Sequence, residues 1–407
     1  MAAGANSQPA DQRTVRRHNL ALVLQRLAAT APRSRARISE ETGLNRSTVS
    51  SIVAELVERG FIREAGIEQE GSIGRPALSL ELNPDGGLAL GLEISADSIA
   101  AYAIDLAGVV RYRAFTYQDN GSRSPAEVMD DLVGIAADTI SLSLSKEIPV
   151  AVTLALHGLV SGKTGRLLDA PHLGWRNVSI VDLWDAAALP APLMIDNEAN
   201  LAAYAELTLG LGKSLRTFGY VSGATGLGLG IVTDGQIYRG AHGFAGEFGH
   251  VTIQPDGPSS SWGGRGTLEV LAGQQALLRM SAITDRAGAR RNEPDRVGAQ
   301  LAKLAADGDV PTLAALEEVG TTLGVGLATL SNLLDFEAII LGGNLSLLEN
   351  WLKPPIEIQI AERVLASKWT DSKVLFSELG REAAVRGAAQ WSLQALLDNV
   401  GSGSVFK

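Results

Sequence analysis

The sequence contains no cysteine among its 407 residues. This absence excludes disulfide bonds, thiolate metal sites, iron–sulfur clusters and cysteine nucleophiles. The sequence also has no run of about 18 uncharged apolar residues, and residues 1–19 lack the apolar core of a signal peptide. We therefore expect a cytoplasmic protein that is not embedded in a membrane.

Basic residues are in the minority over the whole chain, which has a formal net charge of −10. They are unevenly distributed: residues 11–63 carry ten arginines and five acidic residues, whereas residues 83–407 carry 24 basic and 36 acidic residues. A small DNA-binding module on an acidic effector domain produces such asymmetry, and so does ordinary solvated surface charge. The length favours two or three domains, and the hydrophobic fraction of 45% is enough to give each a core.

Three helices are predicted in the basic N-terminal region. The first spans residues 14–30, the second spans residues 35–42, and the third begins at Asn45. Gly43 suits the end of the second helix, because glycine readily takes the left-handed conformation that follows a helix. The first and third helices each carry an apolar stripe at helical spacing: Leu20, Val23, Leu24 and Leu27 in the first, and Val49, Ile52, Val53 and Leu56 in the third.

Residues 61–64 and 77–82 predict a two-stranded hairpin, which would be the wing of a winged helix-turn-helix. The exposed face of the third helix is small and polar, so it can enter a DNA major groove about 12 Å wide. Arg75, between Gly74 and Pro76, can reach a phosphate or a narrow minor groove, or belong to an ordinary surface turn. The candidate DNA-binding residues are Arg35, Asn45, Arg46, Ser47, Thr48, Ser50, Ser51 and Arg75.

The longer C-terminal region predicts an α/β architecture. Residues 83–86 are rich in turn formers and suit a linker. Apolar segments alternate with helical patterns, which is typical of α/β domains. We expect strands at residues 87–94, 99–105, 150–156, 218–221 and 338–341, and helices at residues 125–145 and 268–280.

A glycine-rich stretch at residues 221–250 is the most specific pattern in the chain. Gly226, Gly228 and Gly230 stand at alternate positions, which lets backbone amides approach a ligand, commonly a phosphate. Gly240 and the segment Gly246-Glu247-Phe248-Gly249-His250 follow. This combination resembles the signature of the ROK family of sugar kinases and repressors. Residues 14–82 resemble the winged helix of the ROK repressors, including Gly74-Arg75-Pro76.

The resemblance covers nearly all of residues 87–390 and implies a fold. We expect an α/β protein with a winged helix-turn-helix at residues 1–82, a linker at 83–86 and a sugar-kinase-like sensor domain at 87–407. The sensor would have the two-lobed actin/hexokinase-like (ribonuclease H-like) ATPase fold, with sugar and nucleotide meeting in the cleft. We place the boundary between the lobes near residue 190 and expect the C-terminal helix to return to the first lobe.

Three family elements depart from the pattern of an active kinase. The phosphate loop reads Glu93-Ile94-Ser95-Ala96-Asp97-Ser98, without the family's two glycines, so ATP would bind poorly. Glu198 replaces the aspartate that acts as the base, and its extra methylene displaces the carboxylate by about 1 Å. The zinc element, residues 260–269, has lost all three cysteines, and His250 alone cannot hold zinc. We expect no catalytic residues, metal or cofactor, and a loop fixed by packing of Trp262.

A set of polar residues typical of a sugar site is retained. Carboxylates and amides each bridge neighbouring hydroxyls, although every member taken singly also has a structural interpretation. Pentoses, hexoses, amino sugars and their phosphates all fit the set. The candidate sugar-binding residues are His172, Asn197, Glu198, Glu247, His250 and Glu269.

These features predict a sugar-responsive repressor that binds operator DNA. Two-fold symmetry of a homodimer or homotetramer would match an inverted repeat in the DNA. The alternatives are an active ATP-dependent sugar kinase with a fused DNA-binding headpiece, and a regulator that no longer binds a ligand.

Overall fold

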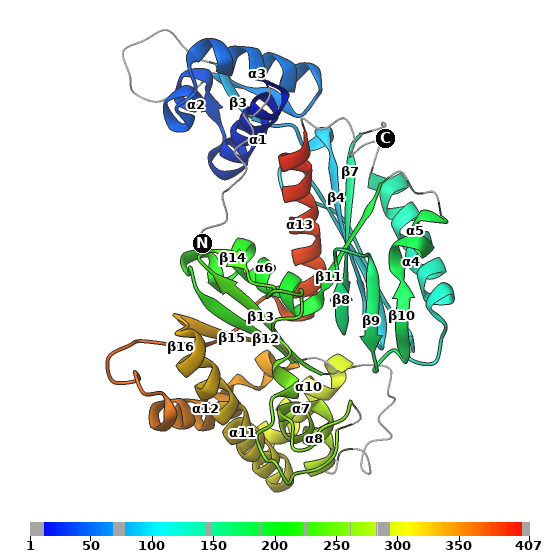
Figure 1. Cartoon of the computed structure of the whole chain (residues 1–407), viewed down its shortest axis with the longest axis vertical. Coiled ribbons are helices and arrows are strands. Elements are labelled where there is room, and N and C mark those ends of the chain that lie inside the picture. The colour runs from blue at the N-terminus through cyan, green and yellow to red at the C-terminus, as the bar shows by residue number, and fades with distance from the viewer. Residues whose placement is uncertain are drawn as a thin grey trace, which may run out of the picture.

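A computed structural model describes residues 12–67, 78–143, 148–187, 189, 191–223, 226–260, 262–281, 283 and 294–400. Figure 1 shows a small N-terminal domain, blue, above a larger body of two lobes. Helix α13 (Ala383–Asn399), red, runs from the N-terminal domain into the middle of the body. The two-part architecture expected from the sequence is confirmed.

The N-terminal domain packs three helices on a three-stranded antiparallel sheet of order β1-β3-β2. Asn45 caps the third helix, because its Oδ1 accepts the Thr48 N–H at 2.8 Å. Gly43 ends the second helix at φ +72°, a conformation that favours glycine. The elements are α1 (Gln12–Thr30), β1 (Arg33–Ser34), α2 (Arg35–Thr42), α3 (Arg46–Glu58), β2 (Ile62–Ile67) and β3 (Leu78–Leu82), followed by the 3-10 turn η1 (Pro84–Gly86).

The first lobe is built on a five-stranded sheet of order β11-β7-β4-β5-β6. Strands β11, β7 and β4 are parallel, and β5 and β6 are antiparallel to their neighbours. Helix α4 covers one face and α13 the other (Figure 1). The elements are β4 (Leu88–Ile94), β5 (Ser98–Asp105), β6 (Val110–Tyr117), α4 (Pro125–Ser143), β7 (Val150–Leu156), β8 (Leu159–Ser161), β9 (Arg166–Ala170), β10 (Trp175–Ser179), α5 (Ile180–Asp185) and β11 (Leu193–Asn197).

The second lobe has a five-stranded sheet of order β14-β13-β12-β15-β16. Its outer face is covered by a helical layer whose apolar residues form one continuous core with the sheet. The elements are β12 (Phe218–Gly223), β13 (Leu227–Thr233), β14 (Gln236–Ile237), η3 (Phe248–His250), α7 (Leu268–Ala272), α8 (Gln274–Met280), α10 (Pro294–Ala306), α11 (Val310–Leu334), β15 (Ala338–Gly343), η4 (Asn344–Leu348), α12 (Glu349–Arg363), β16 (Lys373–Phe376) and η5 (Gly380–Glu382).

Helices α6 (Glu198–Leu209) and α13 pack together between the two sheets, with the 3-10 turn η2 (Leu211–Ser214) after α6. Their contact is close because α13 carries small residues. A Cβ on Gly387 would lie 1.8 Å from the Leu201 carbonyl oxygen of α6, so only glycine fits. The N-terminal domain rests on the far end of α13, where Gln25 donates to Asp398 at 2.6 Å.

Two sequence expectations differ from the structure in detail. Residues 268–280 form two short helices, α7 and α8, because Gly273 adopts an extended conformation and interrupts the helix. The lobe boundary expected near residue 190 lies later in the chain. Strand β11 pairs with β7, so the first sheet continues to Asn197, and the second sheet begins at Phe218.

Helix α11 is long and apolar enough to cross a membrane by length and composition, and it is the one such helix among the described residues. Its residues Leu316, Leu323 and Leu327 are fully buried in the core of the second lobe. Core helices commonly have this composition.

Candidate functional site

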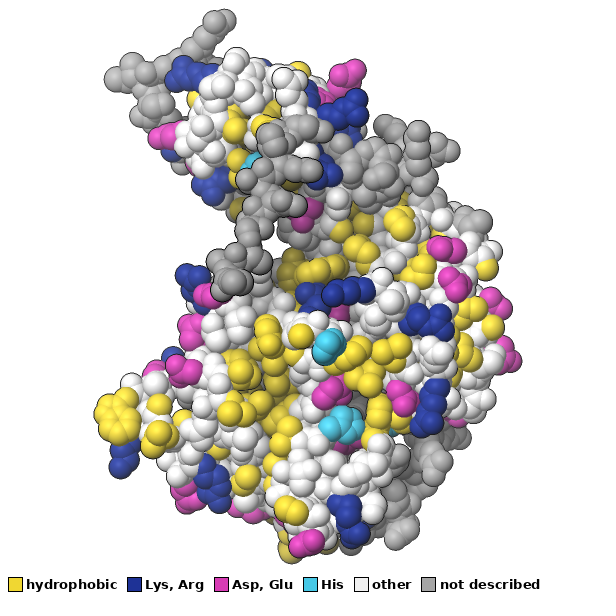
Figure 2. Space-filling view, in the orientation of Figure 1, with side chains coloured by type: hydrophobic (Ala, Val, Ile, Leu, Met, Phe, Trp, Pro, Cys, Tyr) yellow, Lys and Arg dark blue, Asp and Glu magenta, His cyan; other side chains and the backbone are white. Residues whose placement is uncertain are grey.

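A pocket between the lobes brings together residues from distant parts of the chain. It lies at the carboxyl ends of the parallel strands β7 and β11, the edge at which ligands bind in open α/β sheets. Figure 2 shows histidine and acidic side chains gathered in the middle of the body. All six residues expected to bind a sugar line this pocket: His172, Asn197, Glu198, Glu247, His250 and Glu269.

Asn197 fixes the point at which β11 turns into α6. Its Oδ1 accepts the Ala199 N–H at 2.8 Å, and its Nδ2 donates to the Gly158 carbonyl at 3.0 Å. The side chain thus caps the helix as it lines the pocket. This cap places Glu198, the first residue of α6, with 7% of its surface exposed.

Two carboxylates of the second lobe have different charge states. Partial removal from water, together with the carboxylates of Glu198 and Glu269, raises the pKa of Glu247 to about 7, although 41% of its side chain stays exposed. Burial also acts to raise the pKa of Glu269, but the His172 ring, 3.8 Å from Oε1, and the Leu227 N–H, 2.9 Å from Oε2, outweigh it and lower the pKa. At neutral pH the pocket therefore holds an ionised Glu269 beside a Glu247 that is partly protonated.

Trp262 forms part of the pocket wall. Its ring packs edge to face against His250, at 4.9 Å between centroids, and against His172, at 6.4 Å. Within the described chain, three buried polar atoms of the lining have no hydrogen-bond partner: His172 Nε2, Asn200 Oδ1 and Trp262 Nε1. Because an unpaired buried polar atom costs about 1–3 kcal/mol, a ligand rich in hydroxyl groups that pairs with them would be stabilised.

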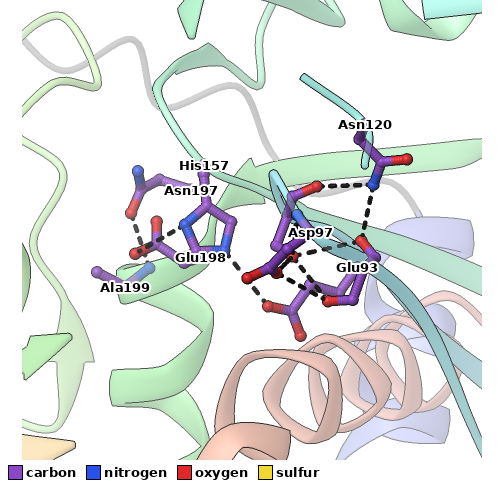
Figure 3. Close-up of polar contacts among 9 residues, drawn as sticks. Glu93, Asp97, Asn120, His157, Asn197, Glu198 and Ala199 are labelled. Carbon is purple, nitrogen blue, oxygen red and sulfur yellow. Dashed lines mark hydrogen bonds and ion pairs between the residues drawn. The ribbon is translucent and has the colours of Figure 1, made fainter. Parts of the chain in front are cut away.

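His157 is a pocket residue that the sequence analysis missed. Figure 3 shows it between Glu93 and Glu198, with its Nε2 3.4 Å from Glu93 Oε1 and its Nδ1 3.7 Å from Glu198 Oε1. Burial acts to lower its pKa, but the carboxylates of Glu198 and Glu93 outweigh burial and raise the pKa to about 9. His157 is therefore an imidazolium at neutral pH.

A sequence signal for His157 does exist. It follows directly after the buried strand predicted at residues 150–156, and ligand-binding residues of α/β proteins concentrate at such strand ends. Asn200 and Trp262 also line the pocket, and neither was predicted to bind a ligand. The sequence analysis expected Trp262 only to fix a loop by packing.

The loop from Glu93 to Ser98 is closed by its own side chains. Asp97 accepts a hydrogen bond from Ser95 Oγ at 2.7 Å, and the Ser95 N–H donates to the Ser98 carbonyl at 3.0 Å. Asn120 Nδ2 donates to the carbonyls of Ser95 and Ser98 at 2.7 and 3.0 Å (Figure 3). A loop that presents a carboxylate and uses its amides internally does not fit the phosphates of a nucleotide.

The loop from Ser260 to Thr267 does not fit zinc. Hydroxyl and indole groups stand where thiolates are needed. No group of three or more His, Asp or Glu side chains that could hold a metal ion occurs among the described residues. The loop is instead held by the Gly266 N–H donating to the Pro258 carbonyl at 2.7 Å and by the packing of Trp262 on His250.

Six of the predicted DNA-binding residues are exposed on the N-terminal domain. Arg35, at the start of α2, and Arg46, at the start of α3, are exposed, and neither has a side-chain partner in the described chain. Several other arginines of the domain pair with glutamates, such as Arg26 with Glu41 at 2.6 Å. Asn45, Ser47, Ser50 and Ser51 are exposed, Thr48 is half-buried, and Arg75 lies outside the described residues.

The side chain of Asn45 has a structural role in addition to its predicted role in DNA binding. Its Oδ1 accepts hydrogen bonds from the Thr48 N–H at 2.8 Å and from Ser47 Oγ at 2.7 Å. Its side-chain oxygen therefore orders the start of α3, the segment that carries Arg46.

Residues 89–395 match the ROK family, and residues 19–66 match the IclR helix-turn-helix domain. The chain belongs to the ROK family. A curated relative, the xylose repressor of Bacillus spizizenii, is 31% identical over 392 residues, which cover 96% of this chain and 99% of the relative. A ROK transcriptional regulator homologous to the E. coli MLC protein has a similar structure, with 27% identity, a TM-score of 0.79 and coverage of 95% of this chain and 98% of that one.

A ROK glucokinase from Streptomyces griseus, solved with glucose and AMPPNP, matches at 27% identity and a TM-score of 0.64. It covers 76% of this chain and 100% of its own, so the match leaves about a quarter of this chain uncovered. This ROK protein thus joins the family domain to a DNA-binding helix-turn-helix, the composition of a transcription regulator.

The glycines of the ROK signature have two structural uses. A Cβ on Gly230 would lie 2.2 Å from the Ala199 carbonyl oxygen, so this glycine allows β13 to pack on the first turn of α6. A Cβ on Gly226 would lie 2.5 Å from Glu269 Oε2 and 3.3 Å from His172 Nε2, so that glycine leaves room in the pocket. Packing of β13 on α6 therefore accounts for Gly230, and the approach of backbone amides to a ligand stays a prediction.

Proposed function

We propose that this ROK protein is a sugar-responsive repressor of carbohydrate-utilisation genes and has no kinase activity. One observation carries the proposal: the pocket retains a full set of sugar-type residues, while the neighbouring Glu93–Ser98 loop is closed on its own Asp97. A sensor needs a sugar site and does not need a loop that holds the phosphates of a nucleotide.

Each wall of the pocket has a role in holding a sugar. Glu198 and Glu269 accept hydrogen bonds from sugar hydroxyls, and the partly protonated Glu247 is able to donate as well as accept. His172 and His250 present ring nitrogens, and the orphaned Nε1–H of Trp262 is a further donor. Asn197 acts by fixing the start of α6.

A continuous set of contacts links the pocket to the N-terminal domain. Arg239 of the second lobe donates to Asp196 of the first lobe through Nη2 at 2.6 Å, and its guanidinium lies over the Trp391 ring of α13 at 4.7 Å. Trp391 stands in the middle of α13, and at the C-terminal end of this helix Asp398 accepts from Gln25 and the Val400 carbonyl accepts from Arg59. A sugar that changes the lobe arrangement would in this way move α13 and the headpiece together.

Recognition of an operator follows from symmetry. A homodimer or homotetramer would present two α3 helices related by a two-fold axis, which suits an inverted repeat with half-sites about 34–36 Å apart. Arg35 and Arg46 would contact phosphates, and the small polar face of α3 would lie in the major groove.

A ligand screen tests the sugar part of this function. Thermal unfolding is measured with D-xylose first, because curated relatives are xylose repressors, and then with D-glucose and N-acetylglucosamine. At least one sugar is expected to raise the Tm, and Glu269→Gln is expected to reduce that shift, whereas Glu349→Gln, on the exposed surface of α12, leaves it unchanged. Flat curves with every sugar would favour a regulator without a ligand.

The rival function is an ATP-dependent sugar kinase with a headpiece, which the likeness to the glucokinase favours. A coupled assay with ATP and the same sugars distinguishes the two. We expect no turnover above background, and measurable sugar phosphorylation by the purified chain would replace the repressor with an enzyme.

A further inference from the structure

The charges around the pocket restrict the class of sugar that can bind, and this inference rests on the proposed function. Three carboxylates, Glu198, Glu247 and Glu269, line the pocket, and none of its described lining residues is lysine or arginine. A phosphate monoester carries a charge of about −1.5 to −2 at neutral pH, and proteins hold it with arginine, lysine or helix N-termini. The described lining of this pocket therefore offers neither an arginine nor a lysine to a phosphate.

The helix N-termini at the pocket do not supply an anion site either. Helix α6 begins with Glu198, and the short helix α7 carries Glu269 in its first turn. Each carboxylate already occupies the position at which the helix dipole would attract a phosphate.

The candidate cations left among the described lining residues are three histidines, and each already faces a carboxylate. His172 Nε2 lies 3.8 Å from Glu269 Oε1, and His250 Nε2 lies 3.8 Å from Glu247 Oε2.

His157 is the most enclosed of the three and faces two carboxylates. Figure 3 shows its ring held from both sides, by Glu93 and by Glu198. The side chains of His157, Glu93 and Glu198 are only 15%, 14% and 9% exposed, so the charges are shielded from water. Two carboxylates balance this one imidazolium and leave no positive charge for a ligand.

His157 and Glu198 also separate the pocket from a second cavity. They are the two described residues that line both spaces. Beyond them the second cavity is lined by Glu93 and Asp97, and its arginine, Arg381, lies over the Phe115 ring at 3.5 Å and donates to the Tyr117 hydroxyl. A phosphate that extended past His157 would therefore enter a cavity that holds two more carboxylates, and the one arginine among its described lining residues is already engaged by aromatic side chains.

We propose that the pocket takes an uncharged aldose and excludes sugar phosphates, and that the Glu93–His157–Glu198 arrangement is the part that excludes the phosphate. His157 is a positioning residue in this scheme, since it holds Glu198 towards the sugar and closes the side of the pocket that faces the Glu93–Ser98 loop.

Calorimetric titration of the full chain tests this proposal with matched pairs of ligands. D-xylose, D-glucose and N-acetylglucosamine are each compared with their 5- or 6-phosphate at neutral pH. The Kd of the best-binding sugar is expected to be at least about tenfold lower than the Kd of its phosphate. A phosphate that binds as tightly as its parent sugar, or more tightly, overturns the inference and leaves the proposed function intact. Failure of every sugar and every phosphate to bind overturns the proposed function as well.

A charge variant tests the part assigned to Glu93. Glu93→Gln removes one carboxylate beside His157, so the discrimination against the phosphate is expected to fall by about tenfold. Asp97→Asn, on the loop beyond His157, is expected to act in the same direction. Glu349→Gln, which removes a carboxylate that lines neither cavity, provides the matched control. An unchanged ratio of the two Kd values in both Glu93→Gln and Asp97→Asn would show that this arrangement does not exclude the phosphate.

Discussion

His157, Glu93 and Glu198 show how single residues divide one cleft into two spaces. A carboxylate such as Glu198 would be costly to bury beside Glu247 and Glu269 without a nearby cation. The imidazolium of His157 offsets that cost and is itself stabilised by the two carboxylates that it contacts. The pocket is therefore stabilised by the pairing of His157 with Glu93 and Glu198. The six residues expected to bind a sugar do not include His157 or Glu93, so they did not indicate this pairing.

The raised pKa of His157 predicts a dependence of stability on pH. Because its pKa is about 9 in the folded chain and about 6.5 in the unfolded one, the stabilisation is fully present below pH 6.5 and is lost as the pH rises through about 9. His157→Gln should therefore lower the free energy of unfolding by about 2–3 kcal/mol below about pH 6.5, and by much less near pH 9. Urea denaturation over this range measures the difference, and a loss that does not change with pH would contradict it.

Glu247 predicts an effect confined to higher pH. Its pKa is raised from 4.5 to about 7, so ionisation in the folded chain is unfavourable and stability declines as the pH rises from 4.5 through about 7. Its side chain is 41% exposed, and water screens much of the cost, so Glu247→Gln should stabilise the protein by only about 1 kcal/mol near pH 8. Near pH 4 the variant and the wild type should unfold alike; equal unfolding near pH 8 as well would refute the prediction.

Helices α6 and α13 are the elements that join the pocket to the headpiece. Helix α6 starts at the pocket with Glu198, and α13 ends at Asn399, next to the Val400 carbonyl that accepts from Arg59. Small residues at their contact allow a close approach, which couples the position of one helix to that of the other. At this scale the sequence is less informative, because the many alanines in both helices favour helix formation without indicating which partners the helices meet.

A single added methyl group tests that contact. Gly387→Ala places a Cβ 1.8 Å from the Leu201 carbonyl oxygen, and we expect it to destabilise the protein by about 3 kcal/mol. Gly134→Ala is the matched control, since Gly134 is an exposed residue of α4 and a Cβ added there would have no other atom within 4 Å. Alanine at that position should stabilise the protein by about 0.5–1 kcal/mol. Equal melting temperatures for the two variants would show that α6 and α13 are less closely packed.

The cap of α3 predicts a linked effect on folding and on DNA binding. Asn45→Ala removes the acceptor of the Thr48 N–H and should cost about 1 kcal/mol of helix stability. Asn45→Ser retains a capping oxygen and should remain close to the wild type. Thermal unfolding together with DNA affinity measures both effects, and full DNA affinity in a destabilised Asn45→Ala variant would separate the cap from recognition.

For the whole molecule, local patterns predicted the helices of the N-terminal domain and several strands of the body, and the resemblance to the ROK family indicated the six residues that line the pocket. Helices such as α11 and α12 were not among the expected elements. Local patterns could not predict what depends on three-dimensional packing. The pairing of β11 with β7 moved the lobe boundary past residue 190, and the extended Gly273 divided a helix in two. His157 was missed because its role depends on its contacts with Glu93 and Glu198, which lie far from it in the sequence.

The central claim is that sugar binding in the body controls DNA binding by the headpiece. The most direct measurement is selection of preferred duplexes from a random pool by the full chain, followed by titration of the best duplex with and without a saturating sugar from the thermal screen. We predict an enriched inverted repeat whose affinity changes at least about tenfold when the sugar is present. No enriched sequence, or the same affinity in the presence and absence of every sugar that binds, would contradict the account.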